Sequence, residues 1–90
     1  MQVQKTALVT GADRGIGLAI ACRLAAQGWR IALHGLADEA GQAAALAAVR
    51  AAGAADAAFF GADLRSGDAT RQLAETVLAH YGRVDVLVNN

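Results

Sequence analysis

Three glycines follow the first apolar segment of the chain at a spacing that suits phosphate binding. Residues 10–17 read TGADRGIG, so the spacing of the glycines is G-x-x-x-G-x-G. Glycine permits turns that a Cβ obstructs, and it lets backbone amides come close to a phosphate. The start of the helix expected here adds free N–H groups and a positive dipole end. The motif predicts a dinucleotide site that includes Gly11, Asp13, Arg14, Gly15, Ile16 and Gly17.

Incidental turns can also contain three glycines, so the elements around this motif decide its meaning. Apolar segments rich in β-forming residues predict strands at residues 6–10, 30–33 or 30–35, 57–60 and 84–89. Helical periodicity predicts helices at residues 15–27, 38–52 and 66–81, where Ser66 or Asp68 caps the third. Gly28, Gly53 and Gly82 are expected to end these helices. The motif therefore lies between a strand and a helix, as phosphate binding requires.

The alternation of strands and helices predicts an α/β fold. Strands that read as continuous apolar runs are typical of a parallel sheet buried on both faces. Right-handed crossovers would wind the βαβαβαβ chain into a Rossmann-type, doubly wound sheet with strand order 3-2-1-4. Ligands bind such sheets beyond the carboxyl ends of the strands, at the switch point between strands 1 and 4.

Composition narrows the classes of partner and compartment. Ninety residues make one domain at most, and eight basic and eight acidic side chains cancel, which gives no reason to expect nucleic acid or a membrane surface. No apolar run approaches the roughly 18 residues of a membrane span, and no export segment is visible, so we expect a cytoplasmic protein. Cys22 is alone and is expected to be buried, and the two histidines lack metal-ligand spacing, so no metal site is expected.

Three motifs together resemble the short-chain dehydrogenases/reductases. TGxxxGIG after a Leu-Val strand is the first, the pair Asp63 and Leu64 is the second, and VDVLVNN at residues 84–90 is the third. The resemblance covers the whole chain. It implies that Asp63 and Leu64 contact the adenine ring of a nicotinamide dinucleotide. It also implies that Asn89 helps to hold the central sheet and that Asn90 lies beside the cofactor ribose.

The family resemblance implies an NAD(P)-dependent oxidoreductase that interconverts an alcohol and a carbonyl on a small molecule. Residues 34–38 and 61–69 look like the D-3-hydroxybutyrate dehydrogenase branch, and residues 11–17 look like the 3-oxoacyl-acyl-carrier-protein reductases. A 3-hydroxyacyl or 3-oxoacyl substrate is therefore favoured. The alternatives are a dinucleotide-binding or sensing module without catalysis, and an α/β interaction domain that binds no nucleotide.

The catalytic residues of the family lie beyond this sequence. The resemblance implies a serine, a Tyr-x-x-x-Lys pair and a further asparagine downstream of an Asn-Asn-Ala-Gly motif, and the sequence stops at Asn90. Tyr81 has an aspartate, not a lysine, four positions later, and it fits a helix-packing role. We therefore expect residues 1–90 to be the N-terminal portion of one dinucleotide-binding domain, inactive alone, from a protein that is a homo-oligomer at full length.

The choice between NAD and NADP depends on a few residues near the end of the second strand. An acid at that place hydrogen-bonds the ribose 2′-hydroxyl, but Gly35 occupies it here. Asp38 is interpreted first as a helix-start acid, and His34 as a strand-end histidine that is also within reach of the ribose. Arg14 can pair with a 2′-phosphate. The residues slightly favour NADP over NAD.

Overall fold

The protein is described here by a computed structural model, which covers residues 4–90. The strands are β1 (Thr6–Val9), β2 (Arg30–Gly35), β3 (Asp56–Gly61) and β4 (Val86–Val88), and the helices are α1 (Gly15–Ala25), α2 (Glu39–Ala52) and α3 (Gly67–Tyr81). All neighbouring strands pair in parallel, and the sheet order is β3-β2-β1-β4. The predicted parallel sheet and its order are confirmed.

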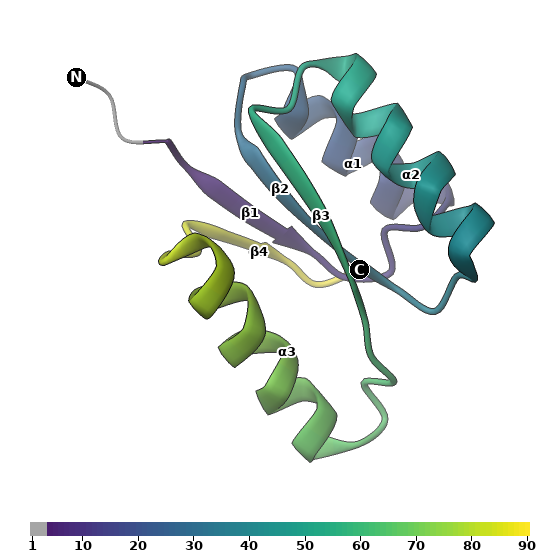
Figure 1. Cartoon of the computed structure of the whole chain (residues 1–90), viewed down its shortest axis with the longest axis vertical. Helices are drawn as coiled ribbons and strands as arrows, with labels where there is room; N and C mark the ends of the chain where they lie inside the picture. The colour runs from purple at the N-terminus through teal and green to yellow at the C-terminus, as the bar shows by residue number, and fades with distance from the viewer. Residues whose placement is uncertain (1–3) are drawn as a thin grey trace.

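The helices cover both faces of the sheet (Figure 1). Helices α1 and α2 pack on one face, where Val9, Ile31 and Leu33 are fully buried. Helix α3 packs on the other face, where Leu73, Val77 and Tyr81 meet residues of β1 and β2. The alternation along β1 explains the division, because successive side chains of a strand point to opposite faces. Ala7 and Val9 accordingly belong to the first core, and Leu8 belongs to the second.

The layer between α1, α2 and the sheet is built largely from small side chains. Ala21, Ala25 and Ala45 are 0–1% exposed and form part of that core. Short side chains let helices approach each other and the sheet closely, because little volume separates the backbones. Cys22, expected to be buried, is only partly buried beside this core. It follows Ala21 on the helix, so its side chain lies at the margin of the fully buried stripe rather than within it.

Helix α1 and strand β4 are shorter than the sequence predicts by two residues or more, while β1 ends one residue early, at Val9. Helix α1 ends at Ala25, because Gln27 and Gly28 donate to the carbonyls of Leu24 and Ala25 at 3.0 and 2.8 Å, which tightens the last turn. Strand β4 covers only Val86–Val88 rather than residues 84–89. Before it, the backbone N–H of Asp85 donates to the Thr6 carbonyl at 2.8 Å, which places Asp85 at the edge of the sheet.

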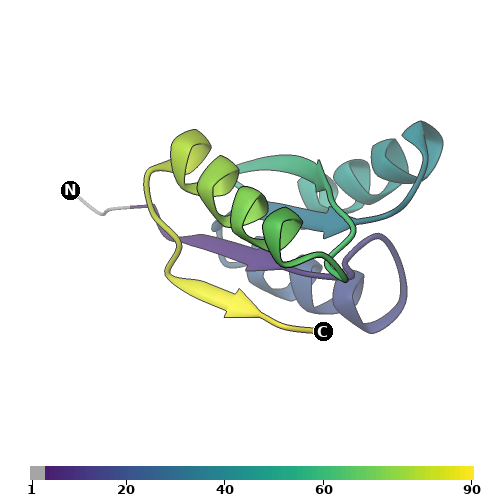
Figure 2. The same ribbon diagram turned by 90° about the horizontal axis from the view of Figure 1, so that it is seen from below.

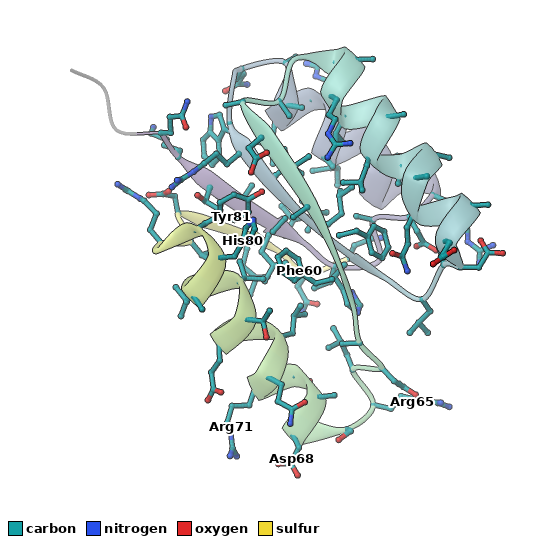
Figure 3. All side chains as sticks on the ribbon, viewed as in Figure 1. Phe60, Arg65, Asp68, Arg71, His80 and Tyr81 are labelled. Atoms are coloured by element: carbon teal, nitrogen blue, oxygen red, sulfur yellow. The ribbon has the colours of Figure 1, made fainter. Side chains whose placement is uncertain are left out.

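Side chains join the strands at the edge where the strands begin, which we call the amino edge. Arg30 Nε donates to Thr6 Oγ1 at 3.0 Å, and the Arg30 guanidinium lies 5.2 Å from the centre of the Tyr81 ring. The Tyr81 hydroxyl donates to Asp56 Oδ2 at 3.0 Å. Figure 3 shows Tyr81 at the end of α3 that faces this edge. One side-chain network therefore connects β1, β2, β3 and α3.

A second cluster at the amino edge joins β1 to the segment before β4. The Thr6 N–H donates to Asp85 Oδ2 at 2.8 Å, and Asp85 also pairs with Arg83. The opposite edge, where the strands end, is called the carboxyl edge. Figure 2 shows the strand arrows pointing together toward that edge, where residue 90 also lies.

Candidate functional site

The glycine-rich turn leaves β1 at the carboxyl edge and is joined there to the end of β4. The Thr10 N–H donates to the Val88 carbonyl at 3.0 Å, and the Asn90 N–H donates to Thr10 Oγ1 at 3.0 Å. Asn90 Nδ2 donates to the Gly11 carbonyl at 3.1 Å. Thr10 Oγ1 lies 3.4 Å from Asn89 Oδ1 as well. Neighbouring strand ends thus fix the position at which the turn begins.

Gly17 lies where the returning helix crosses the start of the turn. A Cβ at this position would be 2.3 Å from the Gly11 carbonyl oxygen and 2.8 Å from Asn90 Nδ2. Real Cβ atoms do not approach a backbone oxygen this closely, so a larger residue would push α1 away from the strand end. Gly17 therefore allows α1 to pack closely against the end of β1.

Helix α1 begins without a side-chain cap, unlike the other helices in the described part of the chain. Its N-cap residue, Arg14, makes no capping hydrogen bond, and its first turn holds no acidic residue. In α2, Asp38 Oδ1 accepts from the Gly41 N–H at 2.9 Å, and in α3, Ser66 Oγ accepts from the Ala69 N–H at 3.4 Å. The first amides of α1 therefore remain available to an external acceptor, and the helix dipole favours an anion there.

Gly15 leaves open space in front of these amides. Its φ is +62°, a left-handed conformation that favours glycine, and apart from its chain neighbours and its own helix backbone no atom lies within 4 Å of the place where its Cβ would be. The neighbouring Ile16 side chain is 73% exposed. Gly15 and Ile16 are exposed and present backbone and one apolar side chain to solvent at the carboxyl edge, whereas Gly17 is buried. This surface suits a ligand with both phosphate and apolar parts.

A cavity of about 670 Å³ lies beside the turn, and we call it the larger cavity. Its walls come from the ends of β1 and β2, from the segment after β3 and from residue 90. Five predicted site residues line it: Gly11, His34, Asp63, Leu64 and Asn90. Its other walls include Leu36, whose side chain is 72% exposed. The mixture of apolar and polar groups suits a flat ring attached to a sugar.

A cavity of about 380 Å³, the smaller cavity, adjoins the start of α2. Asp13 and Arg14 line it from the glycine-rich turn, and Leu36, Ala37, Asp38 and Gly41 line it from the other side. Gly35 ends β2 as expected, and it is covered by Asp13, because a Cβ on Gly35 would be 2.8 Å from Asp13 Oδ1. Asp13 is far from Gly35 in the sequence, yet its carboxylate lies next to the end of β2.

Asp38 caps α2, which confirms its interpretation as a helix-start acid. Its Oδ1 atom is bonded to the Gly41 N–H at 2.9 Å while the residue lines the smaller cavity. Tyr81 is confirmed as a packing residue, since it is 8% exposed and lies at the amino edge. Burial and the hydrogen bond to Asp56 raise the pKa of the Tyr81 phenol above its usual value.

His34 connects three segments at the carboxyl edge although its side chain is only 6% exposed. Its Nδ1 atom accepts from the Gly11 N–H at 3.2 Å, and its Nε2 atom lies 2.7 Å from the Ala62 carbonyl oxygen. Its own carbonyl accepts from the Ala12 N–H at 2.7 Å. Both ring nitrogens therefore have partners within the chain.

Asp63 makes an ion pair with Arg65 that shapes the segment after β3. Arg65 Nη2 lies 2.6 Å from Asp63 Oδ2, and the Arg65 N–H donates to Asp63 Oδ1 at 3.1 Å. The hydrogen bond from the Arg65 side chain is the main reason why the pKa of the Asp63 carboxyl lies below its ordinary range. The Arg65 side chain points away from the ribbon in Figure 3, and it is 90% exposed.

Sequence reasoning missed Leu36, which is the one residue that lines both the larger and the smaller cavity. The available signal was a leucine directly after the end of β2, before the helix cap at Asp38, where a loop residue is usually polar. It also missed Thr10 and Arg65, which line the larger cavity. Among residues 4–90, no group of three or more metal-ligating side chains is present, and no helix is long and apolar enough to cross a membrane.

Residues 5–90 match the family model of the short chain dehydrogenases. A 3-oxoacyl-acyl-carrier-protein reductase of Chlamydia trachomatis is 41% identical over 88 residues, which cover 98% of this chain and 35% of that protein. The chain spans about a third of the length of the curated relatives it matches.

Two of the similar solved structures carry a cofactor in their names. An NADH-dependent reductase, A1-R′, complexed with NAD has a TM-score of 0.88 and 37% identity, covering 97% of this chain and 36% of that one. A metagenomic short-chain oxidoreductase in complex with NADP has a TM-score of 0.86 and 44% identity, covering 96% of this chain and 38% of that one.

Proposed function

This chain belongs to the short-chain dehydrogenase family, and from that membership we propose that it forms the dinucleotide-binding part of an NAD(P)-dependent oxidoreductase. The bound nicotinamide would supply or accept a hydride, while the residues described here bind and orient the dinucleotide. No residue of this chain is assigned a catalytic role. The whole protein, meaning the polypeptide that carries this chain, would interconvert an alcohol and a carbonyl.

The observation that carries the proposal is the uncapped start of α1. Its first amides lack a side-chain acceptor, and Gly15 leaves open space at the start of the helix. A diphosphate suits both features, because it accepts from amides and needs close backbone approach. We assign diphosphate binding to the turn of Gly11, Gly15, Ile16 and Gly17, and the charge of Arg14 to a 2′-phosphate.

The adenosine part of the dinucleotide is assigned to the larger cavity. Leu36 and Leu64 offer apolar contact to a flat ring, and Asp63 offers carboxylate oxygens to an exocyclic amine. Asn90 would lie beside the ribose, since it borders this cavity and is held to Gly11. The assignment rests on residues from three strand ends that meet at one place.

A 3-oxoacyl or 3-hydroxyacyl substrate is the form of the activity that we favour. The motifs at residues 11–17, 34–38 and 61–69 support it, as does the likeness to a 3-oxoacyl-acyl-carrier-protein reductase. The test is the oxidation of NADPH and NADH by the purified whole protein in the presence of a 3-oxoacyl thioester. Turnover is expected. Tight dinucleotide binding without turnover of any carbonyl compound would instead indicate a sensing module, and no binding at all would refute the proposal.

The preference between the two cofactors is assigned to the smaller cavity, with a slight lean toward NADP. Arg14 can pair with a 2′-phosphate, whereas the carboxylates of Asp13 and Asp38 in the same cavity oppose it. Asp38 is already bonded to the Gly41 N–H. Arg14 and Asp13 should therefore act in opposite directions on NADPH affinity.

Two substitutions in the whole protein test this assignment. Arg14→Ala should weaken NADPH about tenfold and leave NADH nearly unchanged, since one charge-assisted contact is lost. Asp13→Asn should strengthen NADPH relative to NADH by removing a like charge. Fluorescence titration of the reduced cofactors measures both effects, and an unchanged NADPH affinity in Arg14→Ala would show that Arg14 does not contact the phosphate.

A further inference from the structure

His34 is the side chain at the carboxyl edge that bonds to both neighbouring segments at once. It reaches the Gly11 N–H at 3.2 Å on one side and the Ala62 carbonyl oxygen at 2.7 Å on the other. Gly11 begins the glycine-rich turn, and Ala62 precedes the Asp63 and Leu64 pair. The imidazole thus links the segment that would bind the diphosphate to the segment that would bind adenine.

These two contacts determine the protonation state of the ring. A carbonyl oxygen only accepts hydrogen bonds, so Nε2 must carry the hydrogen that points to Ala62. A backbone N–H only donates, so Nδ1 must have a free lone pair for Gly11. Only the neutral imidazole with hydrogen on Nε2 satisfies both partners. Protonation at Nδ1 would place two N–H groups opposite each other and break the contact with Gly11.

We propose that His34 is a positioning residue that holds the start of the glycine-rich turn for the dinucleotide by accepting from the Gly11 N–H, while its bond to Ala62 fixes which nitrogen of the neutral imidazole carries the hydrogen. The inference rests on the proposed dinucleotide function. His34 fixes the first two amides of the turn, because Gly11 donates to its ring and Ala12 donates to its carbonyl at 2.7 Å. The amides that follow are thereby directed toward the open space at Gly15.

The charged groups around His34 do not supply an alternative partner for its ring. Asp63 and Arg65 line the same cavity but pair with each other at 2.6 Å. Asp13 lies over Gly35, the next residue along β2, and Asp38 is bonded to Gly41. Thr10 and Asn90, which also line the cavity, are uncharged. The hydrogen bond to Arg65 keeps the pKa of Asp63 low, so that Asp63 stays ionised in the pH range where histidines change charge.

Acidification should therefore weaken dinucleotide binding through His34. In the whole protein, the dissociation constant of NADH is expected to be about tenfold higher at about pH 5 than at about pH 8, because protonation of the ring would remove the acceptor of the Gly11 N–H. NADH is the suitable probe because it lacks the 2′-phosphate, whose own ionisation changes near about pH 6.

Two substitutions separate the contacts of the ring. In His34→Asn, the amide oxygen can take the place of Nδ1 and accept from Gly11, but it does not titrate. In His34→Gln, the amide nitrogen can reach Ala62, but Gly11 loses its acceptor. The asparagine variant should bind NADH within about threefold of wild type at pH 8 and lose the pH dependence, whereas the glutamine variant should bind about tenfold more weakly at pH 8.

His80→Asn is the matched control, because His80 is exposed on α3 near the amino edge. It should leave both NADH affinity and the pH response unchanged. The inference is overturned if His34→Asn retains the wild-type pH response, or if the asparagine and glutamine variants lose affinity equally. If the glutamine variant does not fold, the pH dependence of NADH affinity in wild type and in His34→Asn still tests the inference. Wild-type protein that binds no NADH would refute the proposed function and the inference with it.

Discussion

At the amino edge of the sheet, charged and hydroxyl side chains join neighbouring strands, whereas at the carboxyl edge the joints are mostly backbone groups. At the amino edge, Arg30 donates to the Thr6 hydroxyl and Tyr81 donates to Asp56. Asp85 accepts from the Thr6 N–H. At the carboxyl edge, Thr10, Asn90 and His34 bond chiefly to main-chain atoms. Both edges are ordered, but by different means.

The difference shows how one sheet can have an amino edge held by its own side chains and a carboxyl edge that is able to bind a ligand. A side-chain network uses up its own donors and acceptors, so the amino edge offers little to a ligand. At the carboxyl edge, the contacts hold the start of the glycine-rich turn and leave the first amides of α1 without a side-chain acceptor. Substitutions at matched positions of the two edges test this division.

The largest effect is expected at Gly17. Gly17→Ala places a Cβ 2.3 Å from the Gly11 carbonyl oxygen, and the required movement of α1 should lower the free energy of unfolding by about 3 kcal/mol. Gly67→Ala is the control, because Gly67 also begins a helix at the carboxyl edge and has no atom within 4 Å of its Cβ position. Denaturant titration measures both, and similar losses in the two variants would contradict the close-packing argument.

Gly15 and Gly28 compare the two edges directly. Both have positive φ, +62° and +83°, and neither Cβ position has an atom within 4 Å. Alanine at either residue should cost about 1–2 kcal/mol of stability, because an L-residue is strained in this conformation. Only Gly15→Ala should also weaken NADH binding, by roughly tenfold or more, since it blocks the approach to the amides of α1. Equal NADH affinities in the two variants would argue against a diphosphate at Gly15.

Tyr81 tests the amino edge at alkaline pH. Its pKa is raised, so in the pH range above about 10 the unfolded chain loses the phenol proton while the folded protein keeps it. Stability is therefore fully present below about pH 10 and falls as the pH rises further. Tyr81→Phe should cost about 1 kcal/mol at neutral pH, through loss of the bond to Asp56, and should reduce the alkaline fall in melting temperature. Dinucleotide affinity should not change.

Asp85 tests the same edge at acid pH with a smaller effect. The pKa of the Asp85 carboxyl is lowered mainly by the hydrogen bond from the Arg83 side chain and further by the hydrogen bond from the Thr6 N–H. Its contribution to stability is present above about pH 4, the ordinary range of an aspartate, and is lost as the pH falls through the lowered value. Asp85→Asn should lower the melting temperature slightly at pH 7 and flatten its acid dependence, whereas Glu75→Gln on the exposed side of α3 should do neither.

Local patterns predicted the fold well, because each one acts within a few residues. Ser66 and Asp38 cap the helices that their positions suggest, and the apolar runs place β1 and β2 at the centre of the sheet. The glycine spacing also located the turn, since Gly17 must be small wherever a helix returns across the end of its own strand. These features need only short-range geometry.

Contacts between distant segments were not predicted. Thr6 and Asp85 are 79 positions apart, and Tyr81 and Asp56 are 25 apart, so no periodicity associates them. His34 was interpreted as a strand-end residue, but its bonds to Gly11 and Ala62 depend on how three strand ends align. Asp13 covers Gly35 for the same reason. Strand register, rather than residue type, decides these parts of the site.

The alanine-lined layer beneath α1 and α2 has a practical meaning for protein engineering. Ala21, Ala25 and Ala45 are 0–1% exposed there, so added methyl groups should push α1 away from the sheet and move the first amides of the helix with it. Helix α3 contributes larger side chains, such as Leu73 and Tyr81, and it does not follow the glycine-rich turn in the chain. Stabilising designs should therefore enlarge the α3 side and leave the alanine layer as it is.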